Sequence, residues 1–124
     1  MKSEDAISYA VRGAAFNIYN ELGPGLFESV YEACLIYLLK KEGFFVQSQV
    51  GLPVIFQGVK LDMGFRIDIL IDNLVVLEVK SVAALHDVHP KQLLTYLKLS
   101  KRKLGLLINF NESPLKIIRI ANGL

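Results

Sequence analysis

Residues 65–80 read FRIDILIDNLVVLEVK, which is two apolar alternations joined by Asp72-Asn73. Alternation with a period of two predicts β-strands, because successive side chains of a strand point to opposite faces of a sheet. One strand is expected from Phe65 to Ile71 and the next from Leu74 to Lys80. The stretch therefore predicts a β-hairpin at the centre of the fold.

The loop of this hairpin determines whether Asp68 and Glu78 share a face of the sheet. Residues directly opposite in an antiparallel pair share a face, so a shift of one residue reverses every side chain. A plain two-residue turn at Asp72-Asn73 places Glu78 on the face opposite to Asp68, whereas a three-residue loop at 72–74 pairs the two carboxylates. We therefore expect an odd-length loop or a β-bulge, with Asn73 at positive φ. The shared apolar face is then Ile67, Ile69, Ile71, Val75, Leu77 and Val79.

The rest of the chain alternates between helical and strand patterns. Apolar residues at helical spacing predict helices from Asp5 to Leu22, from the segment after Gly25 to about Glu42, and from near Pro90 to Ser100. The order, ααββββαββ, predicts an α/β (α+β) fold in which helices surround one mixed sheet. The remaining strands are expected at Phe44–Leu52, Val54–Phe56, Val59–Leu61, Leu104–Phe110 and Leu115–Ile120.

Composition narrows the class of protein. A length of 124 residues predicts a single domain over 1–124. An apolar fraction of 52% excludes intrinsic disorder. The single cysteine, Cys34, excludes an internal disulfide and a four-cysteine zinc or iron–sulfur site. The net charge of +2 is compatible with a nucleic-acid partner. An acidic N-terminus and no apolar run long enough for a membrane span predict a cytoplasmic protein.

Asp68, Glu78 and Lys80 are the first candidate site. Glu78 and Lys80 are two residues apart in a strand, so their side chains share a face. Carboxylates on neighbouring strands are ligands that suit Mg²⁺, and a nearby ammonium can act on a charged group. An exposed ion pair on a strand explains Glu78 and Lys80 equally well when they are taken alone.

Two further groups are carried by predicted helices. Gly25, Glu28 and Tyr31 lie at the start of the second helix, where an acidic residue is favoured by the helix dipole and Tyr31 is expected in the core. Gln92 and Tyr96 are four residues apart and share one helix face, where they could orient a water, a metal ligand or a phosphate.

Two weaker groups lie near the third helix. His86 and His89 have a spacing that allows metal binding, although His89 is equally suited to capping the turn before Pro90. A basic group could contact phosphates, but cations are also favoured at the end of a helix. This basic group is Lys98, Lys101, Arg102 and Lys103.

Together these motifs closely resemble the GxxExxY family of the PD-(D/E)XK nuclease-like superfamily. The resemblance covers nearly the whole chain, and the QxxxY element points to the RecB-type and lambda-exonuclease-type branch. It implies a restriction-endonuclease-like core, a mixed sheet flanked by helices. The motifs are Gly25-x-x-Glu28-x-x-Tyr31, Arg66-Ile67-Asp68, Glu78-Val79-Lys80, Gln92-x-x-x-Tyr96 and Leu104–Phe110.

The resemblance also implies roles for individual residues. Asp68 and Glu78 resemble the metal-binding carboxylates, with Lys80 as the catalytic lysine. The carbonyl of Val79 and the carboxylate of Glu28, directly or through water, would complete the protein's share of an Mg²⁺ or Mn²⁺ site. Gln92 and Tyr96 resemble an accessory motif that positions substrate or metal.

The implied reaction is metal-assisted hydrolysis of a phosphodiester bond in nucleic acid, with DNA favoured, leaving a 5′-phosphate and a 3′-hydroxyl. Two alternatives remain open at this point. The chain could be a catalytically silent nuclease fold that binds nucleic acid or protein. Its high apolar fraction also fits a structural subunit with a buried homodimer face.

Overall fold

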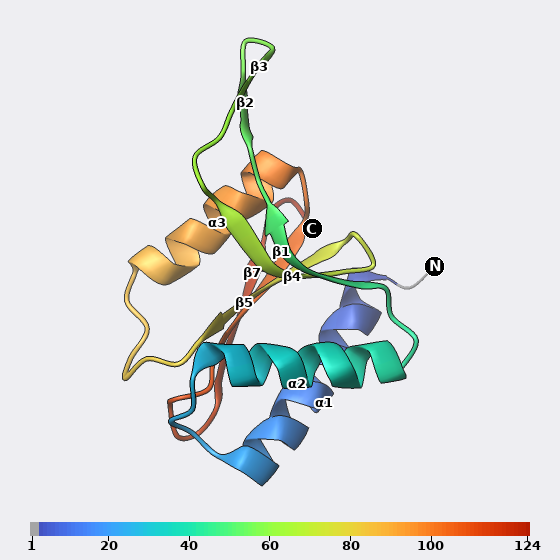
Figure 1. Cartoon of the computed structure of the whole chain (residues 1–124), viewed down its shortest axis with the longest axis vertical. Helices are drawn as coiled ribbons and strands as arrows, with labels where there is room; N and C mark the ends of the chain where they lie inside the picture. The colour runs from blue at the N-terminus through green and yellow to red at the C-terminus, as the bar shows by residue number, and fades with distance from the viewer. Residues whose placement is uncertain (1–2) are drawn as a thin grey trace.

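The computed structural model describes residues 3–124, which form one mixed sheet with helices on both faces (Figure 1). Three helices and seven strands follow the order expected at most positions. The elements are α1 (Glu4–Leu22), α2 (Glu28–Lys41), β1 (Val46–Gly51), β2 (Val54–Phe56), β3 (Val59–Leu61), β4 (Arg66–Ile71), β5 (Val75–Lys80), α3 (Val88–Ser100), β6 (Leu104–Asn109) and β7 (Lys116–Ala121).

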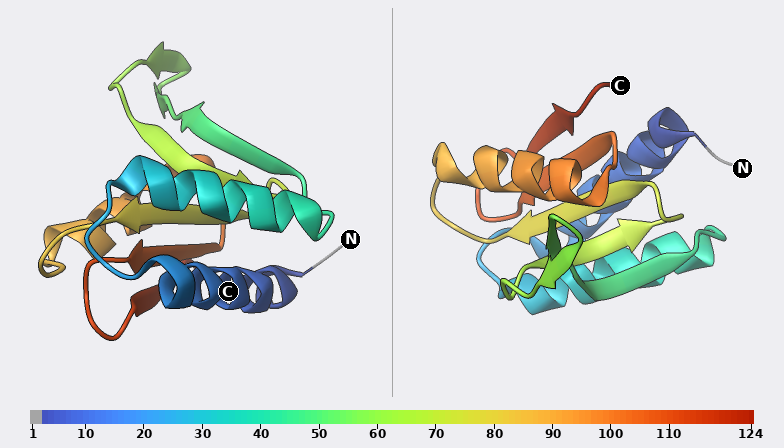
Figure 2. Two further views of the ribbon diagram at one scale, coloured as in Figure 1. Left: turned by 60° about the horizontal axis from the view of Figure 1, so that its bottom comes forward. Right: turned by 90° about the horizontal axis from the view of Figure 1, so that it is seen from above.

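The main sheet has the strand order β1-β4-β5-β6-β7. Only β5 and β6 are parallel; the other neighbours are antiparallel. Parallel neighbours need a crossover connection, and α3 provides it between β5 and β6. In Figure 2, α1 and α2 lie on one side of the sheet and α3 on the other. This is the predicted mixed sheet flanked by helices.

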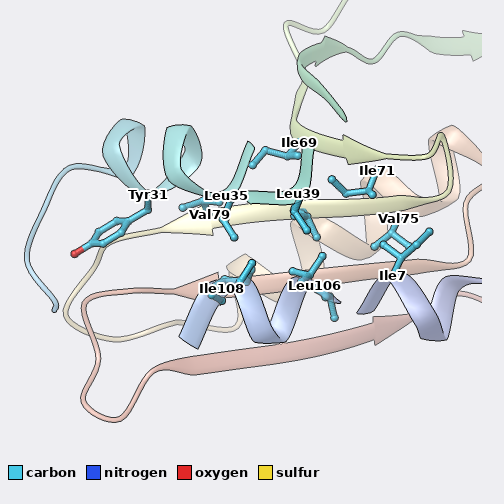
Figure 3. Close-up of a cluster of buried hydrophobic side chains, with 14 of the residues drawn as sticks. Ile7, Tyr31, Leu35, Leu39, Ile69, Ile71, Val75, Val79, Leu106 and Ile108 are labelled. Atoms are coloured by element: carbon cyan, nitrogen blue, oxygen red, sulfur yellow. The ribbon is translucent and has the colours of Figure 1, made fainter. Parts of the chain in front are cut away.

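Each face of the sheet has its own hydrophobic core. The larger core joins α1 and α2 to the sheet, with Ile7, Leu35 and Leu39 from the helices facing the strands (Figure 3). The smaller core joins α3 to the other face through Leu93 and Leu97. The strand β5, which carries the Glu78-Val79-Lys80 (E-x-K) motif, lies between the two cores. Side chains on both of its faces are buried, so its position is fixed from both sides.

The prediction of a single sheet was wrong, and the order ααββββαββ counts one strand fewer than the five ranges predicted before α3. Five strands precede α3, and β2 and β3 form a separate two-stranded sheet. The Leu52 N–H donates to the Phe65 carbonyl at 2.9 Å just beyond the β1–β4 pairs. The next residue, Pro53, has no N–H to donate, so the two chains separate there.

The ends of the helices follow local signals. Ser3 is the N-cap of α1, as its position predicts, and its Oγ accepts from the Ala6 N–H at 3.1 Å. Gly43, just beyond α2, has φ +93, which suits a glycine after a helix. The third helix begins at Val88, two residues before the expected start, and Pro90 lies in its first turn.

The expected register of the β4–β5 hairpin is confirmed. Ile71 pairs with Val75 and Ile69 with Leu77, so three residues separate the last pair. Asn73 has φ +58, as predicted, and Asp72 also lies in the left-handed region at φ +50. The Leu74 N–H closes the turn by donating to the Ile71 carbonyl at 2.9 Å.

The face assignment of this hairpin is correct except at Ile67. Its partners Ile69, Ile71, Val75, Leu77 and Val79 all lie in the larger core. Ile67 instead packs in the smaller core with Leu70. The alternation is interrupted at Asp68, where the β1–β4 pairing skips Gln49 and Asp68, and Gln49 has φ +52.

Candidate active site

The strands β4 and β5 separate at Asp68 and Glu78. Their backbone pairing stops at Ile69 and Leu77, and in Figure 1 β4 turns towards the β2–β3 hairpin while β5 continues towards the loop before α3. The Val79 N–H donates to Asp68 Oδ2 at 2.9 Å, and the Asp68 N–H donates to Glu78 Oε1 at 3.4 Å. Each carboxylate thus accepts from the backbone of the opposite strand, and the two acids come together.

Glu78 is a buried carboxyl group beside a second carboxylate. Its side chain is only 4% exposed. Burial raises its pKa strongly and the charge of Asp68 raises it further, while Lys80 acts in the opposite direction. A cation between the two acids would remove this cost of burying negative charge.

Lys80 ends β5 next to these carboxylates, and Asn109 holds the chain just after it. Lys80 pairs with Asn109 across the parallel strands. Asn109 is completely buried; its Nδ2 donates to the Val82 carbonyl at 2.9 Å and to Glu112 Oε2 at 2.7 Å, and its Oδ1 accepts from the Val82 N–H. Sequence reasoning missed this role, although a polar residue inside the run LGLLINF was a signal for it.

Tyr31 belongs to the core, as expected, and fixes the loop before α2. Its ring stacks on Phe110 with centroids 4.2 Å apart. Its hydroxyl donates to the Gly23 carbonyl at 2.6 Å and accepts from the Leu26 N–H at 3.1 Å. Gly25 within this loop has φ +95, a conformation that favours glycine. The glycine and the tyrosine of the GxxExxY pattern are therefore structural residues that set the start of α2.

The α2 helix carries two acids, Glu28 and Glu32, and Glu32 lies within the electrostatic field of Asp68. Burial raises the pKa of Glu32 to about 7, with further contributions from the charges of Asp68 and Glu28. Gln49 Nε2 donates to Glu32 Oε1 at 3.0 Å. Sequence reasoning named Glu28 and missed Glu32, whose spacing of four residues from Glu28 puts it on the same helix face.

The accessory pair on α3 is brought to the same region. Gln92 Nε2 donates to the Tyr96 hydroxyl at 3.2 Å, as their spacing predicts. Tyr96 also contacts the Phe65 ring, with centroids 5.5 Å apart. Burial raises the pKa of Tyr96, and the charge of Glu78 adds to this shift. The pair therefore lies within the electrostatic field of the carboxylates.

The two histidines form a turn at the start of α3. His89 Nδ1 accepts from the His86 N–H at 3.0 Å, whereas the N-cap position of α3 is Asp87. The described residues, 3–124, contain no group of three or more His, Cys, Asp or Glu side chains placed to hold a metal ion.

The basic group lies at the other end of the β4–β5 hairpin. Arg102 donates to the Asn73 carbonyl at 3.1 Å and to its Oδ1 at 2.7 Å. Lys101 ends α3 with φ +57. Because Asn73 and Lys80 are at opposite ends of β5, the structure does not bring Lys98, Lys101, Arg102 or Lys103 to the carboxylates.

The donors at the open end fit a hard divalent cation. Asp68 and Glu78 offer carboxylate oxygens, and the carbonyl of Val79 lies between Glu78 and Lys80 in the chain. Mg²⁺ prefers oxygen ligands and usually keeps several waters, so two carboxylates and a carbonyl are a sufficient protein share. Burial and, to a smaller extent, the charge of Asp68 raise the pKa of Glu78, so its ionised form is costly here without a cation.

A family model described as the PD-(D/E)XK nuclease superfamily matches residues 5–120. The chain belongs to the PD-(D/E)XK nuclease superfamily. The mixed sheet flanked by helices agrees with the restriction-endonuclease-like fold of that superfamily. PD-(D/E)XK nucleases generally use divalent metals and act on nucleic acid. No curated protein and no solved structure matches the chain. Within the described residues, none of the helices has the length and apolar character needed to cross a membrane.

Proposed function

We propose that this PD-(D/E)XK protein is a metal-dependent nuclease that hydrolyses phosphodiester bonds, with DNA as the preferred substrate. The observation that carries the proposal is the open end of the β4–β5 hairpin. There Asp68 and Glu78 meet through reciprocal side chain-to-backbone hydrogen bonds, and Lys80 follows on the same strand. The superfamily motif supports it, with Asp68 as its first acid and Glu78-Val79-Lys80 as its (D/E)XK element.

The ion would be Mg²⁺ or Mn²⁺, held by Asp68, Glu78 and the carbonyl of Val79, with Glu28 contributing directly or through water. A bound divalent ion lowers the pKa of water and offsets charge on the reacting phosphate. Glu32, one turn from Glu28, adds a carboxylate that orients water near Asp68; its raised pKa supports this placement.

The chain's own residues account for positioning and proton transfer. Lys80 holds the attacking water and, in its neutral form, accepts the proton that the water loses. The water oxygen forms a bond to phosphorus as the bond to the 3′-oxygen breaks. The 3′-oxygen gains a proton from solvent, and the products are a 5′-phosphate and a 3′-hydroxyl. Gln92 holds the Tyr96 hydroxyl in place at the edge of the site.

Structural roles for Gly25 and Tyr31 support assignment to the GxxExxY group within the superfamily. Their contacts set where α2 begins, and α2 begins at Glu28. In this proposal, Gly25 and Tyr31 fix the start of α2 and thereby position Glu28. We further propose that the protein acts in the cytoplasm.

Calorimetric titration with Mn²⁺ tests the metal site. Asp68→Asn and Glu78→Gln should each abolish binding near neutral pH, because amides replace the carboxylates. His86→Ala is the control and should bind as the wild type does. Unchanged Mn²⁺ affinity in both carboxylate variants would remove the basis of the proposal.

Hydrolysis is then measured with Mg²⁺ and Mn²⁺ on single- and double-stranded DNA and RNA. The wild type should cleave and Glu78→Gln should not. A wild type that binds nucleic acid and Mn²⁺ but cleaves none of the four substrates would point instead to a catalytically silent binding module.

A further inference from the structure

The β2–β3 hairpin extends from the body of the molecule beside the strand that leads to Asp68 (Figure 1). The pair of Gly51 with Arg66 and the Leu52–Phe65 hydrogen bond hold its base. We call this hairpin, with the residues of its base, the arm (residues 51–66). Its strand pairs are Val54 with Leu61, Ile55 with Lys60 and Phe56 with Val59.

One face of the arm is entirely apolar. Because opposite residues in an antiparallel pair share a face, the side chains of two pairs lie together on it. Phe56 at the tip is 60% exposed, and none of these side chains belongs to either core. Contiguous exposed apolar side chains mark a binding surface. The four residues are Val54, Phe56, Val59 and Leu61.

A basic cleft lies at the base of the arm. Its volume is about 420 Å³, and Lys60, Arg66 and Asp62 are its charged lining residues. Asp62 Oδ1 accepts the Gly64 N–H at 2.9 Å, so this carboxylate already has a partner. The two cations exceed the single anion, and the cleft is suited to a phosphate group.

Two residues of the cleft connect it to the elements of the candidate active site. Phe65 lines the cleft and also contacts Tyr96, whose hydroxyl is held by Gln92. Arg66 is two residues before Asp68 on β4. The cleft therefore lies beside the first residue of β4, the strand that carries Asp68.

We propose that the arm binds a nucleic-acid strand with unpaired bases. Lys60 pairs with Ile55 and so projects from the face opposite to Phe56. The phosphates therefore contact Lys60 and Arg66 on the cleft side, and the bases pass the edge of the two-stranded arm to contact Phe56 on its apolar face. This inference rests on the proposed function, which makes nucleic acid the substrate. Unpaired bases fit because aromatic side chains stack on base faces that a duplex keeps covered. The paired strands β2 and β3 have 3 residues each, so this part of the arm spans about 10 Å, or about three stacked nucleotides.

Fluorescence anisotropy with a labelled 12-nucleotide single strand tests the apolar face. EDTA is present throughout, so that no cleavage occurs. Phe56→Ala should weaken binding about 5- to 100-fold, and binding to a duplex of the same sequence should change less. Phe45→Ala is the matched control, since Phe45 is 62% exposed but contacts Asp72 at the far end of β4. It should bind within twofold of the wild type.

Salt dependence tests the basic cleft independently. Lys60→Ala and Arg66→Ala should each weaken binding and reduce the slope of log affinity against log salt by about one. Lys40→Ala, on the exposed side of α2, should leave the slope unchanged. Wild-type binding by Phe56→Ala and by both cleft variants would overturn the inference, as would a wild type that binds no single strand.

A second copy of the chain could instead cover the apolar face of the arm. Analytical ultracentrifugation tests this by measuring whether the protein is a monomer or a dimer. A dimer that dissociates in Phe56→Ala while strand binding is unchanged would also overturn the inference. The two proposals fail separately. Arm-dependent binding without hydrolysis contradicts the nuclease assignment alone, whereas hydrolysis with arm-independent binding contradicts only the inference about the arm.

Discussion

The two ends of the β4–β5 hairpin belong to the same two strands, but different hydrogen bonds join the strands at each end. At the turn, Ile71 and Val75 pair as regular backbone partners in the larger core. At the other end the pairing stops, and Asp68 and Glu78 use their carboxylates to accept the backbone N–H groups. The comparison shows that the closed end stabilises the fold, while the open end brings together two carboxyl groups whose ionised forms a cation would stabilise.

The largest expected effect separates catalysis from stability at the open end. Lys80→Ala should lower the rate of hydrolysis by about a hundred- to ten-thousand-fold, because a general base contributes on that scale. Its melting temperature should stay within about 3 °C of the wild type, since Lys80 is outside both cores. Rates come from a gel assay and melting from circular dichroism. Equal rates for the variant and the wild type would contradict the role of Lys80.

The regularly paired end of the hairpin is tested by truncating a buried side chain. Leu77→Ala should lower the free energy of unfolding by about 2–5 kcal/mol, because Leu77 is fully buried in the last regular pair before the strands separate. Val88→Ala, at an exposed position, should change it by less than about 0.5 kcal/mol. Urea unfolding measures both. A loss below 1 kcal/mol for Leu77→Ala would mean that this pair contributes little to the core.

A smaller effect is expected where Arg102 holds the turn. Arg102→Ala removes two hydrogen bonds to Asn73 and should cost about 1 kcal/mol of unfolding free energy. Arg102→Lys should recover only part of it, because lysine cannot make the same paired contact. Mn²⁺ binding should be unchanged in both variants. A change in Mn²⁺ affinity would show that the two ends of the hairpin are coupled.

The smallest effect is a pH dependence of the metal-free protein near the open end. The pKa of Glu32 is raised from 4.5 to about 7 in the folded state, so folding favours its protonated form. Its contribution is fully present below pH 4.5 and is lost as pH rises through 7. Thermal melting in EDTA from pH 5 to 8 should therefore show a decline that is smaller in Glu32→Gln. An identical decline in both proteins would assign it to other groups.

Much of the fold was predictable because the patterns are local. Alternation in residues 65–80 predicts the two central strands, and the parity of the loop predicts the register in which Asp68 stands opposite Glu78 on one face. The second sheet was not predicted as separate, because its separation depends on where the pairing of β1 with β4 ends. Ile67 was assigned to the wrong face for a related reason: alternation assumes a regular strand, and β4 is interrupted at Asp68.

Much of the candidate site was also predictable, but the residues that hold it in place through long-range hydrogen bonds were not. Gln92 and Tyr96 are neighbours because a helix brings residues four apart together, and the structure confirms their contact. Glu32 and Asn109 were missed because their partners, Gln49 and Val82, are distant in the sequence. The basic group from Lys98 to Lys103 was named from charge alone, and charge in a sequence does not say which end of the sheet it will occupy.

The sequence alone determined the periodicities, the loop parity and the residue types of the E-x-K strand. These follow from steric rules that act over a few residues, so they can be worked out without a fold. Only the tertiary structure determined that β4 and β5 separate at Asp68, that the charge of this acid acts on Glu32, and that β2 and β3 form a sheet of their own. Burial and charge at that end depend on residues from α2, β1, β4, β5 and α3, and their effects on one another exist only after the chain has folded.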